Sequence, residues 1–95
     1  MSPDSERRGV RGGQAEFPKP VAWETEAKRV LRAELARAGV TYKGLVLRLE
    51  RIGVVDNETA IASRISRGKF SFAFFLQCMR ALGVTEVDLR DRRER

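Results

Sequence analysis

Glycine divides the chain after residue 20 into a series of short helical segments. Each of four glycines directly follows a stretch in which apolar residues recur at helical spacing, and glycine is the residue that most often ends a helix in the left-handed conformation. The four are Gly39, Gly53, Gly68 and Gly83. Their spacing predicts a compact all-α domain of four helices, or five if the chain turns once more after the last glycine. The expected helices cover about residues 22–38, 42–52, 58–67 and 72–82.

Residues suited to capping a helix stand directly before three of these segments. Thr41 and Ser71 precede the second and the fourth, and either Asp56 or Asn57 can begin the third. The polar side chains of such residues accept hydrogen bonds from the backbone N–H groups of the first helical turn, which otherwise lack partners. The caps and the glycines therefore predict the same helix boundaries.

The apolar positions of the four segments predict the hydrophobic core. The expected core residues are Trp23, Ala27, Val30, Leu31, Leu35 and Ala38, then Leu45, Val46, Leu49 and Ile52, then Ile61 and Ile65, and finally Phe72, Phe75, Leu76, Met79 and Leu82. Phe70 and Phe75 occupy the two positions of a hydrophobic staple, which favours a helix over a strand for this aromatic run. We expect Phe74 and Tyr42 to be packing residues as well. Cys78 is also expected to be a packing residue, because no histidine is present to activate its thiol.

The two ends of the chain lack helical periodicity. Glycines and prolines interrupt residues 1–20, which we expect to form a disordered basic arm before a helical domain at residues 21–90. Residues 91–95 are expected to be a solvated charged tail. For residues 85–90, a short strand and a single helical turn fit the pattern equally well.

Composition excludes several classes of protein. The chain has no histidine and a single cysteine, so it lacks the ligands of a structural zinc site and cannot close a disulfide within the chain. It has no P-loop glycine pattern and no nucleophile with a suitable base, so we expect neither an enzyme nor a bound cofactor. Without an apolar signal core or a membrane-spanning stretch, a soluble cytoplasmic protein is expected.

Positive charge is concentrated in one part of the chain. The formal net charge is +6, which favours an acidic partner such as nucleic acid. No acidic residue occurs between Glu58 and Glu86. The segment 61–80 carries four basic residues, namely Arg64, Arg67, Lys69 and Arg80. Solubility alone does not require such a segment, whereas a surface that meets phosphates gains from it, because each carboxylate would repel the phosphates.

The third predicted helix carries side chains suited to nucleic acid. Thr59, Ser63 and Arg67 are spaced by four residues and share one face of the helix. Hydroxyl groups and guanidinium groups contact both phosphates and base edges. Arg64 and Lys69 are expected to anchor on phosphates beside that face.

Three short motifs resemble the phage-repressor and Cro-like helix-turn-helix domain. They are Thr41-Tyr42-Lys43-Gly44-Leu45-Val46, Ile65-Ser66-Arg67-Gly68 and Ala81-Leu82-Gly83-Val84. The stretch from residue 22 to 84 also resembles a small uncharacterised bacterial domain family thought to be helix-turn-helix. The resemblance implies that residues 21–90 form a helix-turn-helix domain that binds DNA, with Lys43 among the binding residues. In this sequence, however, the distance from Leu45 to Ile65 is about five or six residues longer than in the repressor pattern.

The sequence therefore predicts a small bacterial DNA-binding protein, a transcriptional regulator whose third helix, 58–67, enters the major groove. A domain this small makes few contacts alone, so we expect a homodimer on double-stranded DNA, with the first helix and the C-terminal tail as candidate dimer surfaces. Two alternatives stay open. One is an adaptor module that binds an acidic protein, for which the lengthened connection argues. The other is an RNA-binding domain that uses the basic arm and the third helix.

Overall fold

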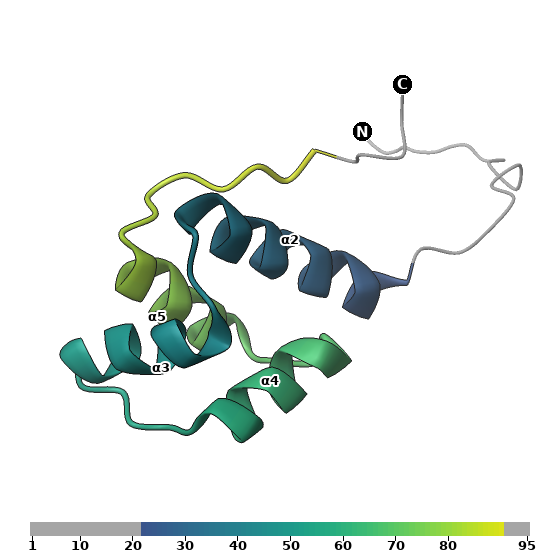
Figure 1. The fold of residues 1–95 in the computed structure, drawn as a ribbon. Coiled ribbons are helices and arrows are strands. Elements are labelled where there is room, and N and C mark those ends of the chain that lie inside the picture. The colour runs from purple at the N-terminus through teal and green to yellow at the C-terminus, as the bar shows by residue number, and fades with distance from the viewer. Residues whose placement is uncertain (1–21, 91–95) are drawn as a thin grey trace, which may run out of the picture.

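A computed structural model describes residues 22–90 of the chain. Within this range the chain forms four helices and no strand (Figure 1). They are α2 (Trp23–Ala38), α3 (Tyr42–Arg51), α4 (Glu58–Arg67) and α5 (Phe72–Leu82). The predicted all-α class with four helices is confirmed, and each boundary lies within one residue of its expected place. The predicted basic arm 1–20 and the charged tail 91–95 lie outside the described residues.

The predicted caps begin α3, α4 and α5. The side chains of Thr41, Asn57 and Ser71 accept hydrogen bonds from the backbone N–H groups of the third helical residue, at 3.1, 2.8 and 3.0 Å. Asn57, and not Asp56, therefore caps α4. At the other ends, Gly39, Gly68 and Gly83 follow α2, α4 and α5 in the left-handed conformation. These local signals explain why the helix boundaries could be predicted.

Each helix contributes to a single core between the four. Both α2 and α3 pack against the same two helices, α4 and α5. In α2, α3 and α4 the buried apolar residues are two side chains four positions apart, and in α5 Cys78 and Met79 join Phe74. The buried apolar side chains are Leu31, Leu35, Leu45, Leu49, Ile61, Ile65, Phe74, Cys78 and Met79, and the charged side chain of Glu34 is buried on α2 as well. The predicted packing role of Cys78 is thereby confirmed.

Five residues predicted to be in the core are exposed instead, and one of them is Ala38, the last residue of α2. Trp23 is 70% exposed because it is the first residue of α2, and Ile52 is 40% exposed because it follows the last residue of α3. Phe72 and Leu76 are 71% and 51% exposed. The apolar run at the start of α5 is compatible with more than one buried face, and the structure buries the face that contains Phe74.

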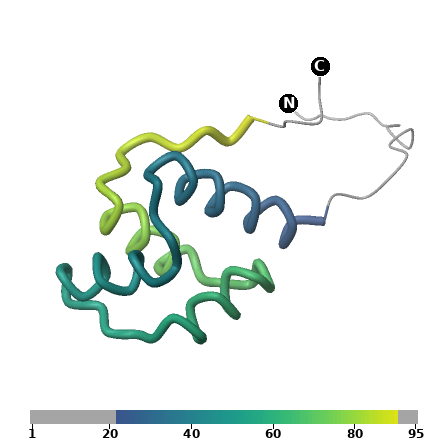
Figure 2. Tube along the Cα trace, viewed as in Figure 1, coloured from purple at the N-terminus to yellow at the C-terminus, as the bar shows by residue number. Residues whose placement is uncertain are grey.

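Residues 84–90 form neither the strand nor the helical turn that the sequence allowed. They run back along α2 in an irregular conformation (Figures 1 and 2). Val87 packs against the core, and the guanidinium of Arg29 donates a hydrogen bond to the carbonyl oxygen of Arg90 at 3.3 Å. A strand needs a neighbouring strand as a hydrogen-bonding partner, and the described residues offer none.

The turn after α4 lies directly against the start of α2. Gly68 is buried and has φ of 68°, and a Cβ atom there would lie 2.7 Å from the carbonyl carbon of Glu24 and closer still to its oxygen. Gly83 has a similar φ of 74°, but a Cβ atom there would meet nothing within 4 Å. Gly68 is therefore required both for its conformation and for the close approach of two backbones.

We expect Gly68→Ala to destabilise the domain by about 2 kcal/mol or more beyond the effect of Gly83→Ala, because only the first change forces the two backbones apart. Gly83→Ala is the matched control and should cost about 1 kcal/mol, the strain of a left-handed alanine. Urea unfolding followed by circular dichroism measures both values. Equal losses of stability in the two variants would contradict the proposed contact.

Candidate nucleic-acid interface

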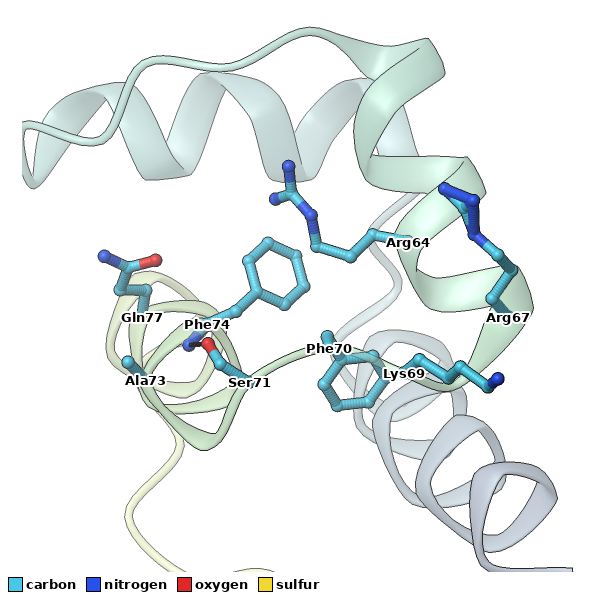
Figure 3. Close-up of a pocket in the computed structure, with 8 residues that line it drawn as sticks. All are labelled: Arg64, Arg67, Lys69, Phe70, Ser71, Ala73, Phe74 and Gln77. Carbon is cyan, nitrogen blue, oxygen red and sulfur yellow. Dashed lines mark hydrogen bonds between the residues drawn. The ribbon is translucent and has the colours of Figure 1, made fainter.

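An open hollow of about 620 Å³ lies between the end of α4 and the start of α5 (Figure 3). We call it the basic hollow, because three cationic side chains and no carboxylate line it. The lining residues are Arg64, Arg67, Lys69, Phe70, Ser71, Ala73, Phe74 and Gln77. The first turn of α5 adds the partial positive charge of a helix N-terminus to the same surface. The electrostatic character of the hollow therefore favours an anion.

Arg64 is held in place by two contacts. Its guanidinium lies 4.8 Å from the centre of the Phe74 ring, which α5 supplies (Figure 3). Its Nη1 atom donates to the Oδ2 atom of Asp56 at 3.0 Å, forming an ion pair in which both side chains are partly shielded from water. Arg64 thus links the connection before α4 to α5 and holds both against α4.

Asp56 changes the charge balance that the sequence suggested. The pKa of its carboxyl group is lowered from the ordinary value of 3.8, first by the hydrogen bond from the backbone N–H of Asn57 and then by the one from Arg64. The carboxylate is therefore charged at neutral pH and offsets part of the charge of Arg64. The segment between Glu58 and Glu86 is free of acids in sequence, but folding brings an acid from outside the segment onto one of its cations.

Arg67 and Lys69 are the outward-facing cations of the basic hollow. Both side chains are exposed, and that of Lys69 extends away from Arg64 (Figure 3). The Nη2 atom of Arg67 donates to the Oγ atom of Ser63 at 2.8 Å, one turn earlier on α4. This bond keeps the guanidinium close to the helix surface while leaving its other N–H groups able to meet an external acceptor.

The structure brings together four of the six predicted binding residues. Arg64, Arg67 and Lys69 line the basic hollow, and Ser63 is joined to them through Arg67. Thr59 is exposed in the first turn of α4, and Lys43 is exposed in the first turn of α3. Neither of these two lines the hollow. Thr59 still shares its helix face with Ser63, whereas Lys43 lies on a different element.

Two residues of this region are not predicted by the sequence patterns. The patterns indicate Asp56 only as a possible helix cap, and they give no role to Gln77, whose side chain lines the hollow from α5. Asp56 and Arg64 are eight positions apart, and no local sequence pattern predicts that two residues at this spacing form an ion pair. Gln77 and Arg80 are the polar residues of an otherwise apolar α5, and this is a weak hint of a polar edge on that helix.

Comparison with protein-family models matches residues 23–87 to the family described as Domain of unknown function (DUF6471). The chain belongs to this family. The matched range contains all four helices and the whole basic hollow. No curated protein and no solved structure matches the chain. The predicted membership of an uncharacterised domain family is confirmed, and the likeness to Cro-like repressors rests on the sequence motifs alone.

Other features of the DUF6471 domain bear on its chemistry. Burial raises the pKa of the Cys78 thiol to about 12, so the group stays protonated at neutral pH. In residues 22–90, no group of three or more acidic or cysteine side chains is placed to hold a metal ion. None of the helices in that range has the length and apolar character needed to cross a membrane.

Asp56→Asn should reduce the stability of the DUF6471 domain at neutral pH and have less effect in acid. A lowered pKa means that the carboxylate stabilises the fold above 3.8 and that this contribution is lost as the pH falls through the pKa of the folded state. Urea unfolding at about pH 7, 5 and 3 should therefore show a stability difference between wild type and variant that shrinks toward the lowest pH.

Glu50→Gln is the matched control, because it removes one negative charge from an exposed position on α3. A stability difference for Asp56→Asn that stays constant from neutral to acid pH would contradict the role assigned to the Asp56 carboxylate.

Proposed function

We propose that this DUF6471 domain binds double-stranded DNA through α4 and the turn at residues 68–70. The observation that carries the proposal is the pair of exposed cations, Arg67 and Lys69, on a hollow whose lining contains no carboxylate. Such a surface releases counterions from DNA when it meets phosphates, and this release supplies much of the affinity of DNA-binding proteins.

The order of the helices supports placing α4 in the major groove. In α3 and α4 the chain has two consecutive helices, and Thr59, Ser63 and Arg67 place polar groups on one face of α4, with Thr59 and Arg67 exposed and Ser63 half-buried. This agrees with the motif likeness to phage repressors, in which the second helix of such a pair reads base edges. On this proposal Arg67 and Lys69 contact phosphates, and Thr59 and Ser63 lie nearest the bases.

Six residues, 52–57, separate α3 from α4. On the motif likeness to phage repressors, this connection is where the longer spacing between Leu45 and Ile65 would fall. The Asp56–Arg64 ion pair and the Asn57 cap fix the end of this connection at the start of α4. We infer that they set the direction of α4 despite the longer turn. A small transcriptional regulator of the cytoplasm, acting as a dimer, is the protein that fits this proposal.

A second candidate is an adaptor that binds another protein, and exposed apolar residues near the connection favour it. Val55 is 82% exposed, and Ile52 and Leu76 line a shallow hollow between the connection and α5. Salt separates the two candidates, since binding to DNA weakens steeply with ionic strength and binding through apolar residues does not. Competition between duplex DNA and RNA tests the third possibility, an RNA-binding domain.

Replacing both outward-facing cations should weaken binding to duplex DNA. We expect the double variant Arg67→Gln and Lys69→Gln to bind about 10- to 100-fold more weakly and to reduce the slope of log affinity against log salt by about two, because each side chain neutralises one phosphate. Fluorescence anisotropy with mixed-sequence duplex DNA across a salt series measures both quantities.

The matched control is the double variant Arg48→Gln and Arg51→Gln in the last turn of α3. It removes the same amount of charge but changes no residue that lines the basic hollow. A similar loss of affinity in this control would show that net charge alone drives binding. If the wild type does not bind duplex DNA even at low salt, the proposal fails.

Asp56→Asn should have the opposite effect on DNA binding. Neutralising this carboxylate leaves the Arg64 guanidinium with its full charge beside the basic hollow, and we expect affinity for duplex DNA to rise about fivefold, equivalent to about 1 kcal/mol. The same anisotropy titration measures the change. Weaker binding would contradict this expectation, and it would mean that losing the α4 direction set by the Asp56–Arg64 ion pair outweighs the gain in positive charge.

A further inference from the structure

A second hollow lies on the side of the turn at residues 68–71 that faces the start of α2. It has a volume of about 470 Å³, and we call it the aromatic groove. The large apolar side chains that line it are Trp23, Val30, Phe70, Phe72, Phe75 and Leu89. Three of these side chains come from different segments and are largely exposed: Trp23 is 70%, Phe72 71% and Leu89 73% exposed.

These exposed residues are not a scattered set. The rings of Phe72 and Phe75 stack with their centres 6.1 Å apart, so the exposed ring is held in one orientation by a partly buried one. Trp23 stands at the first residue of α2, and Leu89 lies on the C-terminal segment that runs along the same helix. Large apolar residues that gather on one preformed surface indicate a site for another protein surface.

We propose that a second copy of this domain covers the aromatic groove. The surface suits a two-fold contact, because Trp23 both lines the groove of its own chain and projects from it, so that each copy can place its indole in the groove of the other. Tryptophan is also among the residues that contribute most to association in protein interfaces.

The charges around the aromatic groove favour a copy of this chain over an acidic partner. The groove contains one acidic and one basic residue, Glu26 and Arg29, which form an ion pair at 3.0 Å. Beside Leu89, Asp88 and Arg90 form another at 2.7 Å. The groove is thus locally neutral in a chain of net charge +6, and two copies can meet there without repulsion between like charges. An acidic partner is instead attracted to the basic hollow.

The size of the surface sets the strength of the dimer. Burying three large side chains that are about 70% exposed removes roughly 350–450 Å² per copy from water. A standard stable interface removes about 800 Å² per partner, so the total here falls in the range of transient complexes. The expected dimer is reversible, with a dissociation constant on the order of micromolar.

Phe70 and Ser71 line both the aromatic groove and the basic hollow. A second copy seated in the groove therefore places the two basic hollows on either side of the contact. This consequence rests on the proposed function: two weak phosphate-binding surfaces joined in this way would bind one duplex more tightly than either surface alone.

The experiment uses Trp23, which is the single tryptophan of the chain, as its own reporter. We expect its emission to shift to shorter wavelength as the full chain is concentrated from about 1 µM to about 500 µM, and sedimentation equilibrium to show a dimer over the same range. Phe72→Ser, which keeps the reporter, should weaken the dimer at least about tenfold, because it removes a central apolar contact.

Leu47→Ser is the matched control, since Leu47 is 54% exposed on α3 and does not line the groove. Circular dichroism and urea unfolding establish that both variants are folded. A monomer at every concentration, a dimer unchanged by Phe72→Ser, or a short-wavelength emission that does not depend on concentration would each overturn the proposal. The last result would mean that one chain covers its own groove. Because DNA is absent, failure here is distinct from failure to bind duplex DNA.

Discussion

The buried contact between Gly68 and the backbone at Glu24 fixes the geometry on which both surfaces depend. It joins the end of α4 to the start of α2, and the chain leaves it directly into the cap of α5. The basic hollow opens on one side of this junction and the aromatic groove on the other. With only four short helices, the domain has a small core, so one contact between backbones determines a large share of its surface.

Arg64 shows how a cation in a basic surface can serve structure and binding together. Its side chain bridges Asp56 and the Phe74 ring, and so ties the connection 52–57 and α5 to α4. A guanidinium group is suited to this position because it can stack on a ring with its face while its edge donates hydrogen bonds. The cations that remain oriented toward solvent, Arg67 and Lys69, follow it by three and five residues. The binding surface is therefore built on a cation that is largely committed to the fold.

Sequence patterns predicted the boundaries of the helices well because those boundaries depend on neighbouring residues. Caps such as Asn57 and stops such as Gly68 act within one turn of their own position. The buried face of α5 was predicted less well, since an apolar run containing Phe72, Phe74 and Phe75 fits several faces, and only contact with the other helices selects one. The partnership of Asp56 with Arg64 depends on the angle between a connection and a helix, which no local pattern encodes.

The ion pair at the end of the connection has a consequence for how the DUF6471 family can diversify. The last two residues of the connection are held in place, Asp56 by its ion pair with Arg64 and Asn57 by its cap on α4. By contrast, Val55 is 82% exposed and Gly53 has open space around it. Val54 packs against the core, so the connection can change length at Val55 without rotating α4, provided that a carboxylate is kept one position before the cap. Insertions and deletions among relatives should gather at this point, while the polar residues that follow it keep their spacing from the arginine of α4.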